Sequence, residues 1–341
     1  MQNNMFNYEW YLKDGYPQSK DNVVKANDYK VFGTFINGGG STMGYKLAGY
    51  NHLGGVEIDP KTAKCYKENH NPLHLFVEDL RDFNMRNDLP KELYNLDILD
   101  GSPPCTTFSM VGKGQKSQGI EKFFSEGNKK QVLDDLLFVY CDTINKLKPK
   151  VFILENVSGL LCKNNQAYIN AVIKKLQDYK IQGFLLNGAD MGLLQTRSRV
   201  FLIGHKKYFD LPSIKLEYNE PKIPFYNISD NTDTICNLTP HFRDYWLKAK
   251  QGESYEKFQA RKKINNDKVA NTLTTTPHFH PTIPRTLNVK EMSLIGSYPL
   301  DYKFSGHKPI FYIGMSVPPL MMANIAYQIK IQWLDFIPKA I

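Results

Sequence analysis

Paired cysteines are missing from this 341-residue chain. Its five cysteines are odd in number, no two of them form a Cys-x-x-Cys pair, and they stand at Cys65, Cys105, Cys141, Cys162 and Cys236. This spacing argues against a disulfide framework and against a zinc ribbon. We therefore expect reduced thiols, no bound metal and an intracellular protein.

Long hydrophobic runs are missing as well. No stretch reaches the roughly 18–20 apolar residues that cross a bilayer, and residues 1–4 are not a charged segment leading into an apolar run. A secretory signal has that pattern. We expect a cytoplasmic protein without a membrane anchor or a cleaved signal.

The chain does have a substantial apolar fraction, 42%, and a net charge of +9. The apolar fraction is typical of a folded globular protein. The excess of Lys and Arg favours a polyanionic partner such as nucleic acid. A basic globular protein without such a partner is the alternative that charge alone leaves open.

Apolar strand patterns alternate with helical patterns between residues 29 and 204. The predicted strands are residues 29–36, 54–58, 73–77, 96–100, 150–154, 181–186 and 199–204, and the predicted helices include residues 42–50, 133–147 and 166–179. Asp59 followed by Pro60 marks a further helix start. Such alternation predicts an α/β sheet with helices on both faces, and ligands bind at the carboxyl ends of the strands of these sheets.

The domain organisation follows from the same patterns. Residues 1–28 are predicted as an N-terminal lead-in and residues 29–204 as the main α/β domain. Residues 205–283 are rich in loops and predict a second, smaller domain. Residues 284–341 regain a regular pattern, with helices expected at 289–295 and from 319 onward.

A glycine cluster lies between the first strand and the first helix, where Phe35 and Asn37 precede Gly38, Gly39 and Gly40. Glycines there let the backbone approach a ligand, and the free N–H groups of a helix start bind polar or anionic groups. The pattern is a distorted form of the dinucleotide fingerprint Gly-x-Gly-x-x-Gly. That favours an adenosine cofactor other than NAD and disfavours an oxidoreductase.

Acidic residues end the next two strands. Glu57, about twenty residues after the glycine cluster, is placed to accept hydrogen bonds from two ribose hydroxyls, the alternative being a solvated acid. Asp79 is placed to accept a bond from an adenine amino group. A helix-capping role for Asp79 is nearly as well supported.

Two prolines precede Cys105 and fix the backbone of the turn that carries its thiol. The flanking residues are polar, which favours a nucleophile over a buried structural cysteine, and residues 109–130 predict a mobile loop that closes over a substrate. Glu155 ends a later strand. Arg197 and Arg199 alternate on an extended segment, so we expect their guanidinium groups to share one face and to hold a phosphate, carboxylate or carbonyl oxygen.

In this order, these motifs resemble the cytosine-5 DNA methyltransferase family over about residues 29–330. The matching segments are residues 35–50, 101–109, 155–157, 195–199, 285–291 and 313–319. The resemblance implies a Rossmann-like, S-adenosylmethionine-dependent methyltransferase fold with a mixed sheet and a target-recognition domain at 205–283. The implied cofactor-binding residues are Phe35, Asn37, Gly38, Gly39, Gly40, Glu57, Ile58, Asp79, Leu80, Pro103, Leu136, Met315, Ser316 and Val317.

The resemblance also implies a mechanism and partners. Cys105 would attack carbon 6 of a flipped cytosine, Glu155 would bind the ring, and Arg197 or Arg199 would hold its O2 oxygen, with Arg199 the closer. Double-stranded DNA would be contacted by Ser109, Lys113 and Arg285, where Arg285 opens a segment that supports the recognition region. A monomer is implied, with a cognate restriction endonuclease as a further partner.

Four positions depart from the family pattern: Asn37, Thr106, Tyr312 and Met315. Asn tolerates positive φ, so the glycine turn is expected to survive at Asn37. None of the four removes a catalytic group. A tRNA cytosine-5 methyltransferase and a non-catalytic DNA-binding homologue are the alternative functions.

Overall fold

The computed structural model describes residues 6–18, 25–104, 122–123, 130–131, 135–162, 165–232, 235, 238–254 and 261–338. The helices are α1 (Gly40–Leu47), α2 (Pro60–His70), α3 (Leu80–Met85), α4 (Leu136–Leu147), α5 (Gln166–Lys175), α6 (Pro240–Lys248), α7 (Val289–Ile295), α8 (Pro309–Met315) and α9 (Pro319–Gln332). The strands of the main sheet are β3 (Lys30–Thr34), β4 (Asn51–Val56), β5 (His74–Phe76), β6 (Ile98–Gly101), β9 (Val151–Val157), β10 (Tyr179–Asn187) and β12 (Ser198–Lys206).

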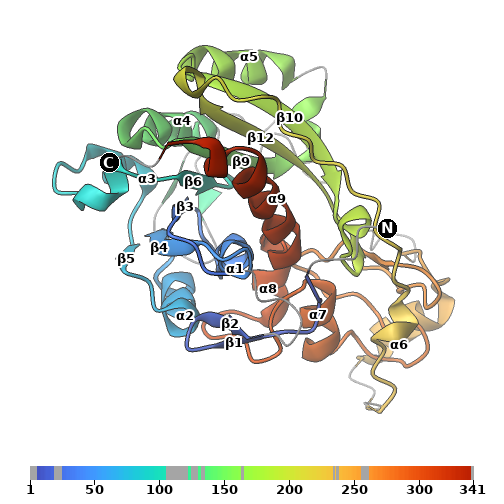
Figure 1. Ribbon diagram of the computed structural model, residues 1–341. Coiled ribbons are helices and arrows are strands. Elements are labelled where there is room, and N and C mark those ends of the chain that lie inside the picture. Colours follow the sequence, from blue (N-terminus) through green and yellow to red (C-terminus); the bar gives the residue numbers. More distant parts are fainter. Residues whose placement is uncertain are drawn as a thin grey trace.

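The main sheet has seven strands in the order β10-β12-β9-β6-β3-β4-β5. Neighbouring strands from β9 to β5 run parallel, whereas β12 is antiparallel to both β9 and β10. The predicted mixed α/β sheet is therefore confirmed, and Figure 1 shows helices on both of its faces. Short two-stranded pairs also form, β1 (Tyr11–Lys13) with β2 (Tyr16–Gln18), β7 (Lys122–Phe123) with β8 (Lys130–Gln131), and β11 (Gln195–Thr196) with β13 (Ala270–Asn271).

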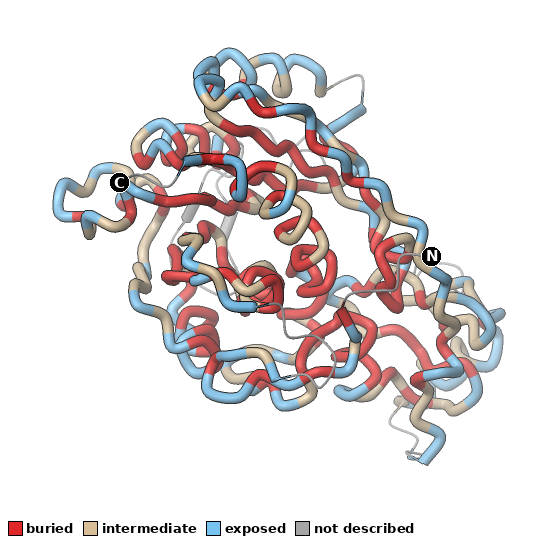
Figure 2. The backbone as a smooth tube through the Cα atoms, in the orientation of Figure 1, coloured by how far each residue is buried: buried red, intermediate tan, exposed pale blue. Residues whose placement is uncertain are grey.

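Successive residues of the central strands contribute to two apolar cores. Val31 packs with α1 and α9 on one face of the sheet, and Phe32 packs with α3 and α4 on the other. Side chains alternate across a strand, so each central strand supplies both cores. Figure 2 shows the resulting buried interior.

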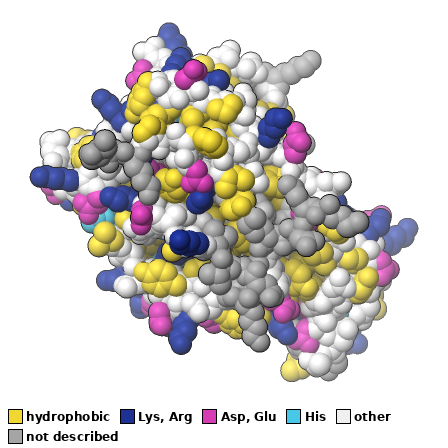
Figure 3. Space-filling view, in the orientation of Figure 1, with side chains coloured by type: hydrophobic (Ala, Val, Ile, Leu, Met, Phe, Trp, Pro, Cys, Tyr) yellow, Lys and Arg dark blue, Asp and Glu magenta, His cyan; other side chains and the backbone are white. Residues whose placement is uncertain are grey.

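The loop-rich region after β12 shares a core with the main sheet. Leu211, Ile214, Leu216 and Phe225 are buried in the same cluster as α1 and α9. The domain limits predicted from the sequence stay predictions. On the face drawn in Figure 3, Lys and Arg side chains are interspersed with Asp and Glu, so net charge alone does not locate a binding face there.

Within the described residues, the helical stretch Pro309–Phe336 has the length and apolar composition of a membrane-spanning helix. Of its apolar window, 72% is buried inside the fold. Figure 1 shows α9 crossing beside α1, next to the sheet. Burial of this kind is typical of a core helix.

Candidate functional site

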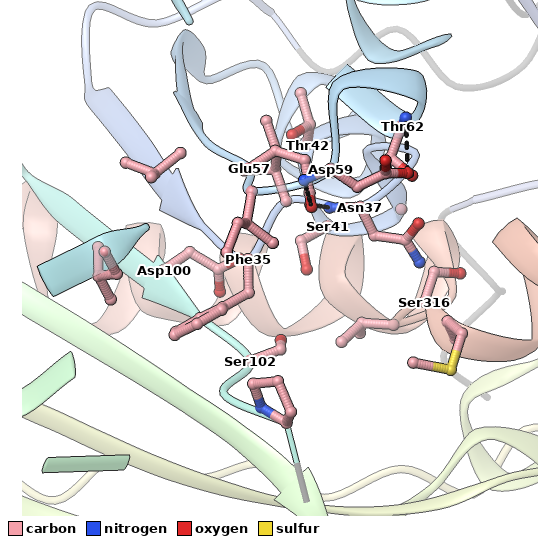
Figure 4. A pocket seen from close by; sticks show the side chains of 18 of the residues that line it. Phe35, Asn37, Ser41, Thr42, Glu57, Asp59, Thr62, Asp100, Ser102 and Ser316 are labelled. Atoms are coloured by element: carbon pink, nitrogen blue, oxygen red, sulfur yellow. Dashed lines mark hydrogen bonds between the residues drawn. The ribbon is translucent and has the colours of Figure 1, made fainter. Parts of the chain in front are cut away.

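A cavity of about 390 Å³ opens at the carboxyl ends of β3, β4, β5 and β6. Figure 4 shows side chains from these strand ends converging on it. Of the predicted cofactor residues, the following line it: Phe35, Asn37, Gly40, Glu57, Ile58, Leu80, Leu136, Met315, Ser316 and Val317. Gly38, Gly39, Asp79 and Pro103 are not part of the lining.

The turn after β3 is held against the end of β4 by Asn37 and Glu57. Asn37 has a left-handed φ of 47°, and its N–H donates to Oε2 of Glu57 at 2.9 Å. Oε1 of Glu57 accepts a second bond, from the N–H of Asp59 at 3.0 Å. Burial raises the pKa of Glu57 to about 7, although both N–H bonds act to lower it.

Two glycines of the cluster allow close packing beneath the turn. Gly39 has a φ of 83°, and a Cβ there would lie 2.2 Å from Nε2 of His70. A Cβ on Gly40 would lie 2.3 Å from the carbonyl oxygen of Val317. The glycine cluster is thus packed against α2 and against the closing motif before α9.

One part of the cavity lining combines apolar side chains with an acidic one. Ile58, Leu80 and Leu136 line it together with Glu78, a residue that sequence reasoning did not select. Asp79 has the capping role that was its alternative: its carboxylate accepts the N–H of Arg81 at 2.9 Å at the start of α3. The adenine contact of Asp79 stays a prediction.

The closing motif borders the cavity with Met315, Ser316 and Val317. Met315 is 57% exposed, so its side chain is free to adapt to a ligand at the rim. Tyr312 is fully buried, and its hydroxyl donates to the carbonyl of Ser305. Both departures from the family pattern are thereby accommodated by the fold.

The proline turn leads from β6 toward the predicted nucleophile. Ser102 and Pro104 line the cavity, and the carbonyl of Pro103 accepts a hydrogen bond from Nδ2 of Asn156 at 3.2 Å. This bond joins the turn to the end of β9. Predictions for Cys105, Thr106, Ser109, Lys113 and most of the loop at 109–130 lie outside the described residues.

Glu155 and Arg199 come together at the ends of neighbouring strands. Antiparallel pairing of β9 with β12 places Glu155 opposite Phe201 and Val157 opposite Arg199. Nε of Arg199 lies 2.9 Å from Oε1 of Glu155. A carboxylate and a guanidinium therefore meet at the end of β9, the strand that also carries Asn156 and so holds the proline turn.

Arg197 does not share that face, which corrects the prediction of a paired oxygen clamp. Its guanidinium is 1% exposed and donates to the carbonyls of Leu273, Gly314 and Ser316 at 2.8–2.9 Å. Arg197 lies in the break between β11 and β12, so the side-chain alternation of one continuous strand does not apply. Arg197 is a positioning residue that joins the sheet to the closing motif.

The comparisons with known proteins decide the family. The model of the C-5 cytosine-specific DNA methylase family matches residues 29–331. The chain belongs to this family. The Type II methyltransferase M.Sau96I of Staphylococcus aureus is 29% identical over 87% of this chain and 74% of its own length. M1.HphI of Haemophilus parahaemolyticus is 28% identical over 86% of this chain and 84% of its own length.

Solved structures show the same fold. A candidate DNA modification methyltransferase encoded in an Escherichia coli prophage covers 89% of this chain and 99% of its own, with a TM-score of 0.65 and 19% identity. A Spodoptera frugiperda DNMT2 variant covers 89% of this chain and 100% of its own, with a TM-score of 0.65 and 16% identity. At these identities the likeness shows the methyltransferase fold alone.

In this methylase family member, Arg285 is buried and does not form the DNA contact predicted for it. It is 0% exposed, and both of its terminal nitrogens bind the Glu291 carboxylate, at 2.8 and 2.9 Å. It also donates to the carbonyl of Asp230 at 2.7 Å. The pair joins α7 to residue 230 of the loop-rich region, so Arg285 supports that region from within.

Several lining residues of this methylase were missed by sequence reasoning. Those with polar side chains are Ser41, Thr42, Asp59, Thr62, Glu78, Asp100 and Ser102. A signal was present for Asp100, because it follows an apolar strand and precedes the proline turn. It was assigned to the strand itself, and strand periodicity does not tell which end residue turns toward a ligand.

Proposed function

We propose that the protein transfers a methyl group from S-adenosylmethionine to carbon 5 of a cytosine in double-stranded DNA, with Cys105 as the nucleophile. The Glu155–Arg199 ion pair carries this proposal. Glu155 lies on β9, the strand whose Asn156 holds the proline turn that leads to Cys105, and that turn borders a cavity of nucleoside-cofactor character. A base bound at the ion pair would contact the Glu155 carboxylate, and the proposal requires the thiol of Cys105, which lies outside the described residues, to reach the same base.

The cavity suits the cofactor. Glu57 offers a buried carboxylate to the two ribose hydroxyls, and Ile58, Leu80 and Leu136 offer apolar contact to an adenine ring. Asn37 Oδ1 and Glu78 Oε1 are buried and have no hydrogen-bond partner among the described residues. Buried acceptors of this kind are normally satisfied, and the hydroxyl and amino donors of the cofactor would satisfy them.

Carbon 5 of cytosine is a poor nucleophile until carbon 6 is attacked. S-adenosylmethionine, when bound, supplies an electrophilic methyl group on its sulfonium sulfur. The thiolate of Cys105 forms a bond to carbon 6, and the electron pair of the 5,6 double bond becomes available at carbon 5. Once carbon 5 has taken the methyl group, its proton would be lost to water and the bond from carbon 6 to the thiolate would break, which restores the 5,6 double bond.

Glu155 and Arg199 would stabilise the ring during attack. The carboxyl group of Glu155 would bond N3 and the exocyclic amino group of the ring and so stabilise the charge that develops there. Arg199 donates to the O2 oxygen and keeps the carboxyl group of Glu155 in place. Arg199 rather than Arg197 is assigned this role, because backbone carbonyls accept from both terminal nitrogens of Arg197.

The cytosine must leave the helix to reach these groups, so base flipping is part of the proposal. Residues 205–283 would read the DNA sequence, with Ser109 and Lys113 as further contacts. We also propose that the enzyme acts as a monomer on cytoplasmic DNA, as the methyltransferase of a restriction-modification system with a cognate endonuclease. Type II names among its relatives support the last point.

The test is transfer of tritiated methyl from labelled S-adenosylmethionine to duplex DNA, with bisulfite sequencing to place the product. Wild-type protein is expected to label DNA, and Cys105→Ser is expected to abolish labelling while cofactor affinity by calorimetry is unchanged. Labelling by Cys105→Ser at the wild-type rate would overturn the nucleophile. Labelling of tRNA instead of DNA would favour the alternative substrate, and no labelling of either would favour a non-catalytic homologue.

A further inference from the structure

Asp100 is a buried carboxyl group in the cavity that no predicted role uses. It belongs to β6, is 4% exposed, and lines the cavity beside Phe35 and Ser41 (Figure 4). The hydroxyl of Tyr45 donates to its Oδ1 at 3.2 Å. Burial raises its pKa to about 7, against the lowering effect of hydrogen bonds from Ser41 and Tyr45.

Among the described residues that line the cavity there are several acids and no base. Four of these residues are carboxylic acids, namely Glu57, Asp59, Glu78 and Asp100, and none of them is Lys, Arg or His. Asp59 pairs with His307 at 2.8 Å and caps α2, and Glu78 pairs with Arg86 at 3.2 Å. Backbone N–H groups donate to Glu57, whereas the hydroxyls of Ser41 and Tyr45 donate to Asp100.

Strand order separates Glu57 from Asp100. Glu57 follows β4 and Asp100 lies in β6, and β3 with its glycine turn runs between these two strands. A nucleoside with its ribose at Glu57, after β4, and its base at Leu80, beyond β5, would direct its 5′ substituent the opposite way along the sheet edge, toward β3 and β6. In S-adenosylmethionine that substituent carries two cationic centres, a sulfonium and an α-ammonium group.

The sulfonium and the ammonium group differ in the hydrogen bonds that they can form with the protein. A sulfonium has no hydrogen to donate, and its methyl group must remain open toward the cytosine. An ammonium group donates three hydrogen bonds and gains most from an ionised acceptor. Asp100, a buried carboxyl group with hydroxyl donors from Ser41 and Tyr45, matches the ammonium group.

We propose that Asp100 binds the α-ammonium group of the cofactor's methionine part, opposite the ribose site at Glu57. This inference rests on the proposed function, because it assigns one end of the same cofactor. Asp100 thereby selects ligands that carry an amino-acid end over simple nucleosides.

Calorimetry with two ligands and the full chain tests this assignment. The ligands are S-adenosylhomocysteine and its deamino analogue, which differ only in the α-amino group, and the proteins are wild type, Asp100→Asn and Glu57→Gln. In wild type, we expect the deamino analogue to bind about tenfold or more weakly, as for loss of a charge-assisted hydrogen bond. Asp100→Asn should lower the affinity for S-adenosylhomocysteine by a similar factor. It should lower the affinity for the deamino analogue by less than about twofold.

The control variant separates a local from a general effect. Glu57→Gln should lower the affinity for both ligands by the same factor, because both ligands contain the ribose. Equal weakening of both ligands by Asp100→Asn would overturn the assignment, as would equal affinity of wild type for the two. The wild-type comparison needs no variant, so it decides even if Asp100→Asn fails to fold, whereas a wild type that binds neither ligand contradicts the proposed function instead.

Discussion

The carboxylate of Glu155 is held by the guanidinium of Arg199, with 2.9 Å between Oε1 and Nε. The two side chains are 11% and 16% exposed, so water screens the pair only weakly. They come from adjacent antiparallel strands, and neither residue can shift along its strand without breaking the register. This pair orients the carboxyl group before any substrate arrives.

Arg199→Met should impair the reaction more than it impairs the fold. The Glu155 carboxylate would lose its cation, and O2 of the substrate would lose a donor, so we expect kcat to fall by about 10²-fold or more. Tritium transfer to duplex DNA measures this. Lys174→Met, at an exposed position of α5 outside the predicted recognition region, is the control that removes a cation; a similar loss of rate in that variant would show that the effect is not specific to the pair.

Arg197→Met should impair the stability of the protein more than it impairs the reaction. The carbonyls of Leu273, Gly314 and Ser316 would lose buried donors, and each unsatisfied group costs about 1–3 kcal/mol. We expect a clear drop in Tm, with kcat of the folded fraction close to wild type. Thermal unfolding and kinetics at low temperature check this, and loss of kcat without loss of stability would restore Arg197 to the catalytic set.

Arg285→Met should destabilise the protein without acting on DNA directly. The buried Glu291 carboxylate would lose its guanidinium partner and keep the N–H bonds of Asp230 and Asn288, and breaking a buried ion pair in this way costs about 3–5 kcal/mol. The double variant Arg285→Met with Glu291→Leu should recover part of this loss. At a temperature where the protein is folded, the salt dependence of DNA affinity should be unchanged; a shallower slope would indicate a phosphate contact.

The pH dependence of stability should reflect Glu57 and Asp100. Both pKa values are raised to about 7 by burial, from ordinary values of 4.5 and 3.8. Between those values and pH 7 the folded chain binds more protons than the unfolded chain, so the free energy of unfolding decreases as pH rises through this window. Urea unfolding at several pH values from 5 to 8 measures the slope of the free energy of unfolding against pH.

Asp100→Asn removes one of the two titrating groups and should make that slope shallower. Asp82→Asn, at an exposed position of α3, is the control and should leave the slope unchanged. An identical slope in Asp100→Asn and wild type would show that Asp100 does not take up a proton on folding.

Local patterns were sufficient for much of the fold. The helix at 289–295 has the predicted bounds, and Asp59 caps α2 with Pro60 at its first turn. Asn37 takes the left-handed conformation that its side chain tolerates at a glycine position. These features depend on neighbours in the chain, and the sequence contains those neighbours.

Roles that depend on distant partners were not predictable in the same way. Arg197 and Arg199 are two residues apart and of one type, yet one binds carbonyls from residues 273, 314 and 316 and the other binds Glu155. Arg285 was expected at DNA, and the structure buries it against Glu291. In both cases the partner lies on another segment, and spacing alone does not specify it.

By itself, the sequence determined the order of strands and helices, the glycine turn and the motifs that identify the family, because these depend on periodicity and on local backbone chemistry. The tertiary structure decided which charged side chains face the cavity and which are buried and bound to partners inside the protein. The physical reason is that a guanidinium or carboxylate binds whatever opposite charge or carbonyl the packing brings within about 3 Å. Strand order and register, which bring Arg199 to Glu155 and Asp100 to the cofactor cavity, exist only once the chain has folded.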